Sequence, residues 1–166
     1  MKQLNLSLFF SLLTLSLLAQ EKLEHINYDI IFDQVQNLTE DATDDERFKL
    51  LNKINPNDSV FDDIQITKSY YKIKSKKYDE ALSIINESFK SKSAIRLSLF
   101  VNKGVCYREK DSFNLAIKAY NDGLKEFPNN YELYYYRGVT HEKNGDLKKA
   151  YDDYIKSISL LSLIHI

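Results

Sequence analysis

The chain has 166 residues, a formal net charge of −1, and 43% hydrophobic and 28% charged residues, which are the proportions of a soluble globular protein. This charge gives no general attraction to nucleic acid or anionic membranes, and 4 Gly with 2 Pro leave little turn chemistry for a β-sandwich or barrel. The single cysteine excludes an internal disulfide, and the three histidines lack the spacing of a metal site. Long helices joined by short turns are therefore favoured.

The first twenty residues, MKQLNLSLFFSLLTLSLLAQ, have the order of a secretory signal peptide: one lysine, a mostly apolar run from Leu6 to Leu18, and the small residue Ala19. The run is short for a membrane span, which needs about 20 apolar residues. We therefore expect residues 1–19 to be removed on export to the periplasm or cell exterior, with membrane contact only before cleavage. An uncleaved anchor is the alternative. The richness in Lys, Asn, Ile and Tyr resembles exported proteins of AT-rich bacteria of the Bacteroidetes kind.

From about residue 21 onward the apolar residues recur at helical spacing, and no strand pattern appears. A first helix covers residues 23–38, and a capping box from Thr43 to Glu46 opens a second that ends near Pro56. Gly145 supplies a left-handed residue past a helix end, and Asp146 can cap the helix that follows. The remaining helices are predicted at about 60–74, 78–90, 94–109, 113–126, 131–143 and 147–160.

Two stretches share one plan at a spacing of 34 residues: FVNKGVCYREKDSFNLAIKAY, which starts at Phe100, and YYYRGVTHEKNGDLKKAYDDY, which starts at Tyr134. A fixed period in this range is typical of a stacked repeat array. The small residues let the two helices of one unit approach closely, and the aromatic residues fill the spaces between units. The matched pairs are Phe100–Tyr134, Gly104–Gly138, Val105–Val139, Phe113–Leu147, Ala116–Ala150 and Tyr120–Tyr154.

This small–large pattern resembles the tetratricopeptide repeat (TPR). The resemblance implies an all-α fold, a right-handed α-solenoid of antiparallel helix pairs. Residues 97–130 and 131–160 match the repeat well. Residues 62–96 are expected to form a degenerate repeat, in which Tyr70 stands at the glycine position and the turn is one residue shorter. Residues 20–61 are expected to form an N-terminal helical pair, which can also be read as a further eroded repeat.

Motifs for catalysis are missing from the sequence. It contains no glycine-rich phosphate loop, no zinc-spaced Cys/His set and no nucleophile elbow, so we expect neither an enzyme nor a cofactor or small-molecule substrate. Cys106 is interpreted as a small core group, and His141, at the place of Tyr107 one repeat earlier, as a packing residue. The acidic pairs 44–45, 62–63 and 152–153 lack the spacing of a calcium loop and are interpreted as solvated groups at helix starts or on an outer face.

In TPR arrays the first helix of each pair lines a concave face that holds a peptide or partner helix. Valine and tyrosine run along the middle of this predicted face with mixed charges beside them, which suits a peptide with apolar anchors. The chaperone-type carboxylate clamp is not matched, because Val105 stands where a clamp asparagine is expected. The alternative is that part of this face packs on another segment of the same protein. By the resemblance, the partner-binding residues are Tyr71, Val101, Asn102, Val105, Arg108, Tyr135, Tyr136, Val139 and Glu142.

The leading functional hypothesis is an exported, non-catalytic scaffold that binds a protein or peptide, without nucleic acid. The alternative is the N-terminal extracytoplasmic sensor part of a larger signalling protein.

The end of the chain, LSLIHI (161–166), departs from the repeat pattern. The last helix should close after Ser159, and a polar capping helix should cover its outer face, which carries Tyr151, Tyr154, Ile155 and Ile158. The hexapeptide also matches the translation of the transposase end sequence used in making sequencing libraries. We therefore expect residues 161–166 to be non-native and the gene to continue beyond Leu160 with more repeats or another domain. The alternative is a genuine apolar tail that packs on a neighbouring molecule.

Overall fold

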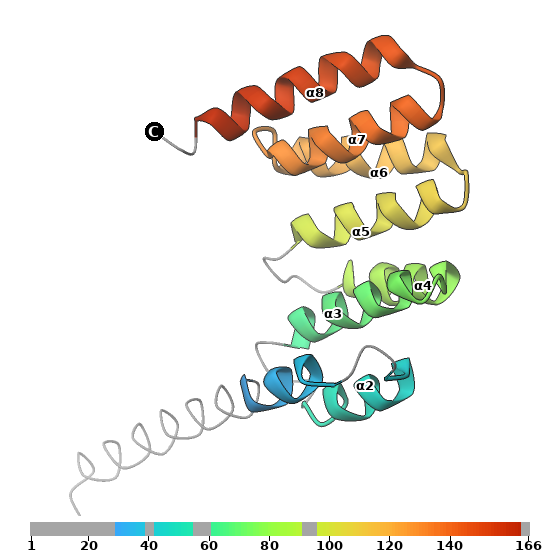
Figure 1. Ribbon diagram of the computed structural model, residues 1–166, viewed down its shortest axis with the longest axis vertical. Coiled ribbons are helices and arrows are strands. Elements are labelled where there is room, and N and C mark those ends of the chain that lie inside the picture. Colours follow the sequence, from blue (N-terminus) through green and yellow to red (C-terminus); the bar gives the residue numbers. More distant parts are fainter. Residues whose placement is uncertain (1–28, 39–41, 55–60, 91–95, 164–166) are drawn as a thin grey trace, which may run out of the picture. The chain divides into compact units, whose positions relative to one another are not determined.

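The computed structural model describes residues 29–38, 42–54, 61–90 and 96–163 (Figure 1). The chain divides into two compact units, Met1–Phe61 and Asp62–Ile166, and each is considered by itself. The predicted signal peptide, the last residues 164–166 and part of the first predicted helix lie outside the described residues.

In the first unit, residues 29–36 are helical and are followed by α2 (Asp44–Leu51). The predicted capping box is confirmed: the Glu46 backbone N–H donates to Thr43 Oγ1 (3.3 Å), and the Thr43 N–H donates to Glu46 Oε2 (2.8 Å). This helix ends at Leu51, before the predicted end near Pro56, because the backbone turns at Asn52–Ile54. The buried apolar side chains of this unit are Ile31, Val35, Leu51 and Ile54.

The second unit contains three helix pairs. They are α3 (Phe61–Lys74) with α4 (Tyr78–Ser88), α5 (Arg96–Glu109) with α6 (Phe113–Glu126), and α7 (Tyr131–Lys143) with α8 (Leu147–Ser162). From α4 to α8 successive helices pack on one another, and the first helices α5 and α7 also touch. In the first pair, Ile66 and Ile73 of α3 pack against the core residues of α4 (Figure 1). All regular elements in the described part of the chain are helices, so the predicted all-α solenoid of antiparallel pairs is confirmed.

The turns within the pairs share one geometry. Each has three residues, and its middle residue has a positive φ: Lys76 (59°), Asp111 (55°) and Gly145 (83°). In each, the next N–H donates to the carbonyl five residues back, as from Asp146 to His141 (2.8 Å), which is the hydrogen bond of a Schellman helix end. The left-handed role of Gly145 is thus confirmed. The Asp146 side chain does not cap α8 as expected, because it accepts a hydrogen bond from Lys149 Nζ (3.1 Å) instead.

The predicted shorter turn in the first pair is wrong, because that turn also has three residues. The spacing of 35 arises between the start of α4 and the end of α5, since Glu109 lies 31 positions after Tyr78 whereas Lys143 lies 30 positions after Phe113. The residue that matches Gly104 is therefore Ser69 (0% exposed) and not Tyr70 (53% exposed). In this pair the position of the glycine is occupied by the small, buried side chain of Ser69.

The close approach of paired helices at the glycines is confirmed. A Cβ added to Gly104 would lie 2.2 Å from Cε1 and Cζ of Tyr120, and one added to Gly138 would lie 2.9 Å from Cδ1 and Cε1 of Tyr154. The alanines at the other matched position, Ala116 and Ala150, are both buried. In each pair an aromatic ring of the second helix rests directly on the backbone of the first.

The core of the second unit follows the repeat. Cys106 is fully buried, and this burial raises the pKa of its thiol to about 12, as fits a core group. Two clusters of buried core residues join neighbouring pairs: Ala81, Leu82, Ile85, Leu99 and Cys106 between the first two pairs, and Phe100, Ala116, Tyr120 and Leu133 between the last two.

The outer side of α8 exposes Tyr151, Ile155 and Ile158, as predicted, while Tyr154 is half-buried. The helix continues to Ser162 and does not close after Ser159, because Leu160 is still buried on its inner side.

Candidate functional site

The first helices of the three pairs present one common side, which we call the A-helix face: the side of α3, α5 and α7 that carries Asn102, Arg108, Tyr135, Tyr136 and Glu142. Three contacts hold these helices side by side. Asn102 Nδ2 donates to Ser69 Oγ (3.0 Å), Lys143 Nζ pairs with Glu109 Oε1 (3.5 Å), and the Arg108 guanidinium lies 6.0 Å from the centre of the Tyr136 ring. The face is therefore a fixed surface made by adjacent repeats.

A row of tyrosines crosses this face. The Tyr135 ring meets Tyr136 edge-on with centroids 5.5 Å apart, and it lies 6.0 Å from the Tyr154 ring of α8. Behind them, Tyr136 stacks on the buried Tyr120 at 6.3 Å. Tyr135 is 50% exposed, so it is the member of the row that is open to a partner, and the other rings hold it in place.

Charges at the edge of the row are paired. The Tyr154 hydroxyl donates to Glu142 Oε2 (2.5 Å), and burial together with this carboxylate raises the pKa of Tyr154 to about 12. Partial burial raises the pKa of Glu109, but the bond from Arg108 and the charges of Arg108 and Lys143 outweigh it and hold that pKa below its usual value. The charged side chains that border the tyrosine row are thus already hydrogen-bonded or ion-paired within the protein.

The structure brings four of the nine predicted residues, Arg108, Tyr135, Tyr136 and Glu142, into one network that also contains Tyr154. The sequence pattern placed Tyr154 between units and on the outer apolar face of the last helix, and not with the binding residues. Its pairing with Gly138 in the repeat pattern was the signal that could have placed it beside the A-helix face. Of the other five, Val105 and Val139 are half-buried, Asn102 binds Ser69, and Tyr71 lies edge-on against Tyr70. Val101 is half-buried and packs against the core around Phe100.

A buried ion pair that the sequence reasoning missed joins α7 to α8. Arg137 donates to both carboxylate oxygens of Asp153 (2.8 and 2.6 Å) and to Asn121 Oδ1 (2.5 Å). Asp153 is 6% exposed, so the interpretation of 152–153 as a solvated pair holds only for Asp152. The reason is that Asp153 lies on the inner side of α8, one turn before the buried Ser157.

The pair 44–45 is a second exception, because Asp44 is buried as well. His141 has the expected packing role: it is buried, with Nε2 4.0 Å from Asp153 Oδ2.

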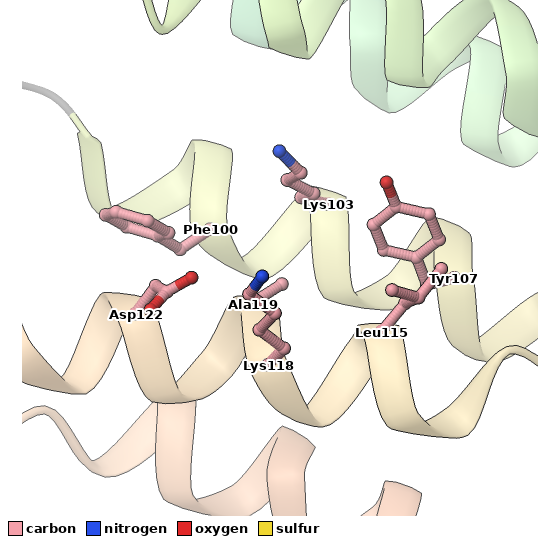
Figure 2. Close-up of a pocket in the computed structure, with 7 residues that line it drawn as sticks. All are labelled: Phe100, Lys103, Tyr107, Leu115, Lys118, Ala119 and Asp122. Atoms are coloured by element: carbon pink, nitrogen blue, oxygen red, sulfur yellow. The ribbon is translucent and has the colours of Figure 1, made fainter.

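On the opposite side of α5 lies a pocket of about 220 Å³ between α5 and α6, which we call the α5–α6 pocket (Figure 2). Positions 100, 103 and 107 of α5 form its wall, and at 3.6 residues per turn these point away from positions 102, 105 and 108 on the A-helix face. None of the nine predicted residues lines it. Its lining residues are Phe100, Lys103, Tyr107, Leu115, Lys118, Ala119 and Asp122.

The described residues hold neither a metal-ligand cluster nor a membrane-spanning helix. No three His, Cys, Asp or Glu side chains among them gather closely enough to hold a metal ion. None of the helices in the described ranges combines the length and apolarity that a membrane crossing requires.

Two tetratricopeptide repeat profiles of known protein families match the second half of the chain. Residues 97–130 match one tetratricopeptide repeat profile and residues 119–152 match another. The second match begins within α6 and ends within α8, so it is out of phase with the first. A NADPH oxidase activator from Dictyostelium discoideum is 33% identical over 82 residues, which are 49% of this chain and 13% of that protein. The matched segment is therefore a small part of this relative.

Solved structures with the same fold have low sequence identity. MamA MSR-1 C2 is 17% identical (TM-score 0.57; 72% of this chain and 68% of that chain are covered). PcrH in complex with the chaperone binding region of PopB is 16% identical (TM-score 0.55; 76% and 86%), and MamA AMB-1 C2221 is 15% identical (TM-score 0.55; 82% and 80%). Residues 97–152 thus carry tetratricopeptide repeats, and the chain has the fold of a TPR α-solenoid.

Proposed function

We propose that this protein is an interaction scaffold whose A-helix face holds a peptide or a helix of a protein partner. The observation that carries the proposal is the fixed tyrosine row, with Tyr135 half exposed between Tyr136 and Tyr154. A ring that is already held by its neighbours loses little rotamer freedom on binding, and tyrosine and arginine are enriched among the residues that dominate binding energy.

The chemistry of the face suits an amphipathic partner. Half-buried Val105 and Val139 extend the apolar strip from Tyr135, and Arg108 and Glu142 place opposite charges beside it. A partner segment with apolar anchors and flanking charged groups can match both features. The PcrH structure, which contains the chaperone binding region of PopB, supports a peptide segment as partner for this fold.

The binding test is a comparison of two tyrosines. The partner is first isolated by cross-linking to the full chain, and its affinity is then measured by calorimetry. Tyr135→Ala and Val139→Ala should each weaken binding at least tenfold with unchanged helicity. Tyr151→Ala, which removes an exposed tyrosine from the outer side of α8, is the matched control and should leave binding unchanged. An equal loss from both tyrosine variants would place the binding surface elsewhere.

Export is a separate part of the proposal and rests on the order of residues 1–19. The mature protein would begin at Gln20 and act in the periplasm or outside the cell. Amino-terminal sequencing of protein from the native envelope should return Gln20 as the first residue. Met1 on membrane-bound protein would replace the cleaved signal with an anchor.

A further inference from the structure

Two equivalent positions in successive repeats have different chemistry. Arg137 of α7 reaches both neighbouring second helices: it donates to Asn121 on α6 and binds the Asp153 carboxylate on α8. Thirty-four residues earlier, the matching cation is Lys103 and the residue that matches Asp153 is Ala119. The α7 site has a carboxylate from its own chain, and the α5 site has a methyl group in that place.

The contact with the preceding helix is conserved within the molecule. Lys103 Nζ donates to Asn86 Oδ1 of α4 (2.8 Å) and lies 5.2 Å from the Phe89 ring. Asn86 corresponds to Asn121 at the 35-residue spacing of the first two repeats. Figure 2 shows the Lys103 side chain pointing away from Ala119. The half of the site that Asp153 fills in the later repeat is therefore open, and the α5–α6 pocket lies there.

The charges that line the pocket are mainly positive. Lys118 is exposed on α6 beside Ala119, and in the described part of the chain neither it nor Lys103 has a carboxylate within ion-pair distance. The carboxylate at the far end, Asp122, is already bound to Lys125 Nζ (2.6 Å). The pocket is therefore lined by two lysines and one carboxylate, and that carboxylate is already paired with Lys125.

The size and the apolar lining indicate what can enter. At about 30 Å³ per water molecule, 220 Å³ is room for roughly seven waters, which is enough for one or two side chains but not for a helix. Phe100 forms a buried floor, Tyr107 is half-buried, and Leu115 is 49% exposed. A free small carboxylate would leave Leu115 uncovered, whereas an apolar residue beside an acidic one would cover it.

We propose that the α5–α6 pocket binds an aspartate or glutamate side chain of a protein partner, with an adjacent apolar residue packed on Leu115 and Tyr107. The partner's carboxylate takes the place that the Asp153 carboxylate has in the next repeat. There it pairs with Lys118 and with Lys103, whose side chain turns from Asn86 toward the pocket on binding. This site lies on the opposite side of α5 from the A-helix face, so it does not depend on the function proposed above. Both surfaces can be occupied at once.

The test is a titration of the ¹⁵N-labelled full chain, followed by amide chemical shifts, with the peptide Ac-Ala-Leu-Glu-Leu-Ala-NH₂. The amides of residues 103, 107 and 115–122 should shift and saturate. The matched peptide with Gln in place of Glu should bind at least fivefold more weakly, because it lacks the charge. Glutarate, a free dicarboxylate, should not saturate at the same concentrations.

The second part of the test repeats the peptide titration with variants of the residues that line the α5–α6 pocket. Lys118→Glu changes an exposed side chain, so it keeps the fold and should abolish saturation, whereas Lys148→Glu makes the same change on the exposed surface of α8 and should have no effect. Ala119→Asp supplies the missing carboxylate internally and should also block the peptide; combined with Lys103→Arg it restores the Arg–Asp pair of the next repeat. No saturable shift, equal affinity for the Gln peptide, equal affinity for glutarate, or unchanged binding by Lys118→Glu would each overturn the proposal.

Discussion

The α5/α6 and α7/α8 pairs have the same packing plan but different surroundings. Tyr120 rests on Gly104 and is 0% exposed, because Tyr136 of the following pair stacks on it. Tyr154 rests on Gly138 in the same way but is half-buried, and its hydroxyl reaches Glu142. A repeat therefore specifies where a ring sits, and its neighbours determine how far that ring is removed from water.

The polar positions differ more than the apolar ones. At the site of Arg137 and Asp153 the later pair has a buried, bidentate ion pair, and the earlier pair has Lys103, Ala119 and a pocket. The small and aromatic positions cannot vary in this way, because a change of volume at a helix crossing forces the backbones apart. Diversification of the repeats is thus concentrated in side chains that do not set the crossing.

The largest expected difference between the pairs concerns the glycines. Gly104→Ala should lower the free energy of unfolding by about 3 kcal/mol or more, and Gly138→Ala by about 1 kcal/mol, within the usual cost of overpacking. The added methyl group meets the Tyr120 ring at 2.2 Å, where Tyr136 prevents the ring from moving, but meets the less buried Tyr154 ring at 2.9 Å. Urea denaturation measures both changes, and equal losses would contradict the account of the neighbour's role.

A second difference should appear at the adjacent aspartates of α8. Asp153→Ala should cost about 3 kcal/mol, because it leaves the partly buried Arg137 without its carboxylate, as in other broken buried ion pairs. Asp152→Ala, one residue earlier on the exposed side, should change stability by less than about 0.5 kcal/mol. The same denaturation experiment applies. A large effect at Asp152, or none at Asp153, would reverse the assignment of the inner and outer sides of α8.

The smallest effect at neutral pH is expected from Cys106, whose counterpart in the later pair is Thr140. Burial raises the pKa of the thiol from 9.0 to about 12, so the folded state holds its proton more tightly than the unfolded state. The resulting stability is fully present below pH 9 and is lost as the pH rises toward 12. Cys106→Thr should show a shallower decline over this range in pH-dependent denaturation. Identical slopes for both proteins would show that the thiol does not titrate with unfolding.

Much of the fold could be predicted because its signals are local or periodic. The capping box at Thr43 and the left-handed Gly145 reflect the conformational limits of a few consecutive residues. Gly104 and Tyr120 recur 34 residues later as Gly138 and Tyr154. This recurrence indicates a contact between the two helices of a pair, because only a small residue leaves room for a ring against the helix backbone.

The sequence pattern predicts the wrong register for the first pair, because the register depends on the connection between repeats. With a period of 34, Tyr70 falls at the glycine position; the extra residue between α4 and α5 moves that position to Ser69. The face of the helix that turns inward is fixed by the helix packed against it. If the length of a loop is misjudged by one residue, the predicted inward-facing side of the helix is rotated by about 100° around the helix axis.

The sequence by itself determined that the second unit is built of helix pairs and, for the last two pairs, where each pair turns and which small residues lie at the crossings, because these follow from steric limits on residue size and backbone angle. Only the tertiary structure decided that Asp153 is buried against Arg137 while Asp152 faces water, that Tyr154 joins the A-helix face, and that a pocket opens beside Ala119. These features arise from atoms far apart in sequence, and their energies depend on how much water the neighbouring helices exclude.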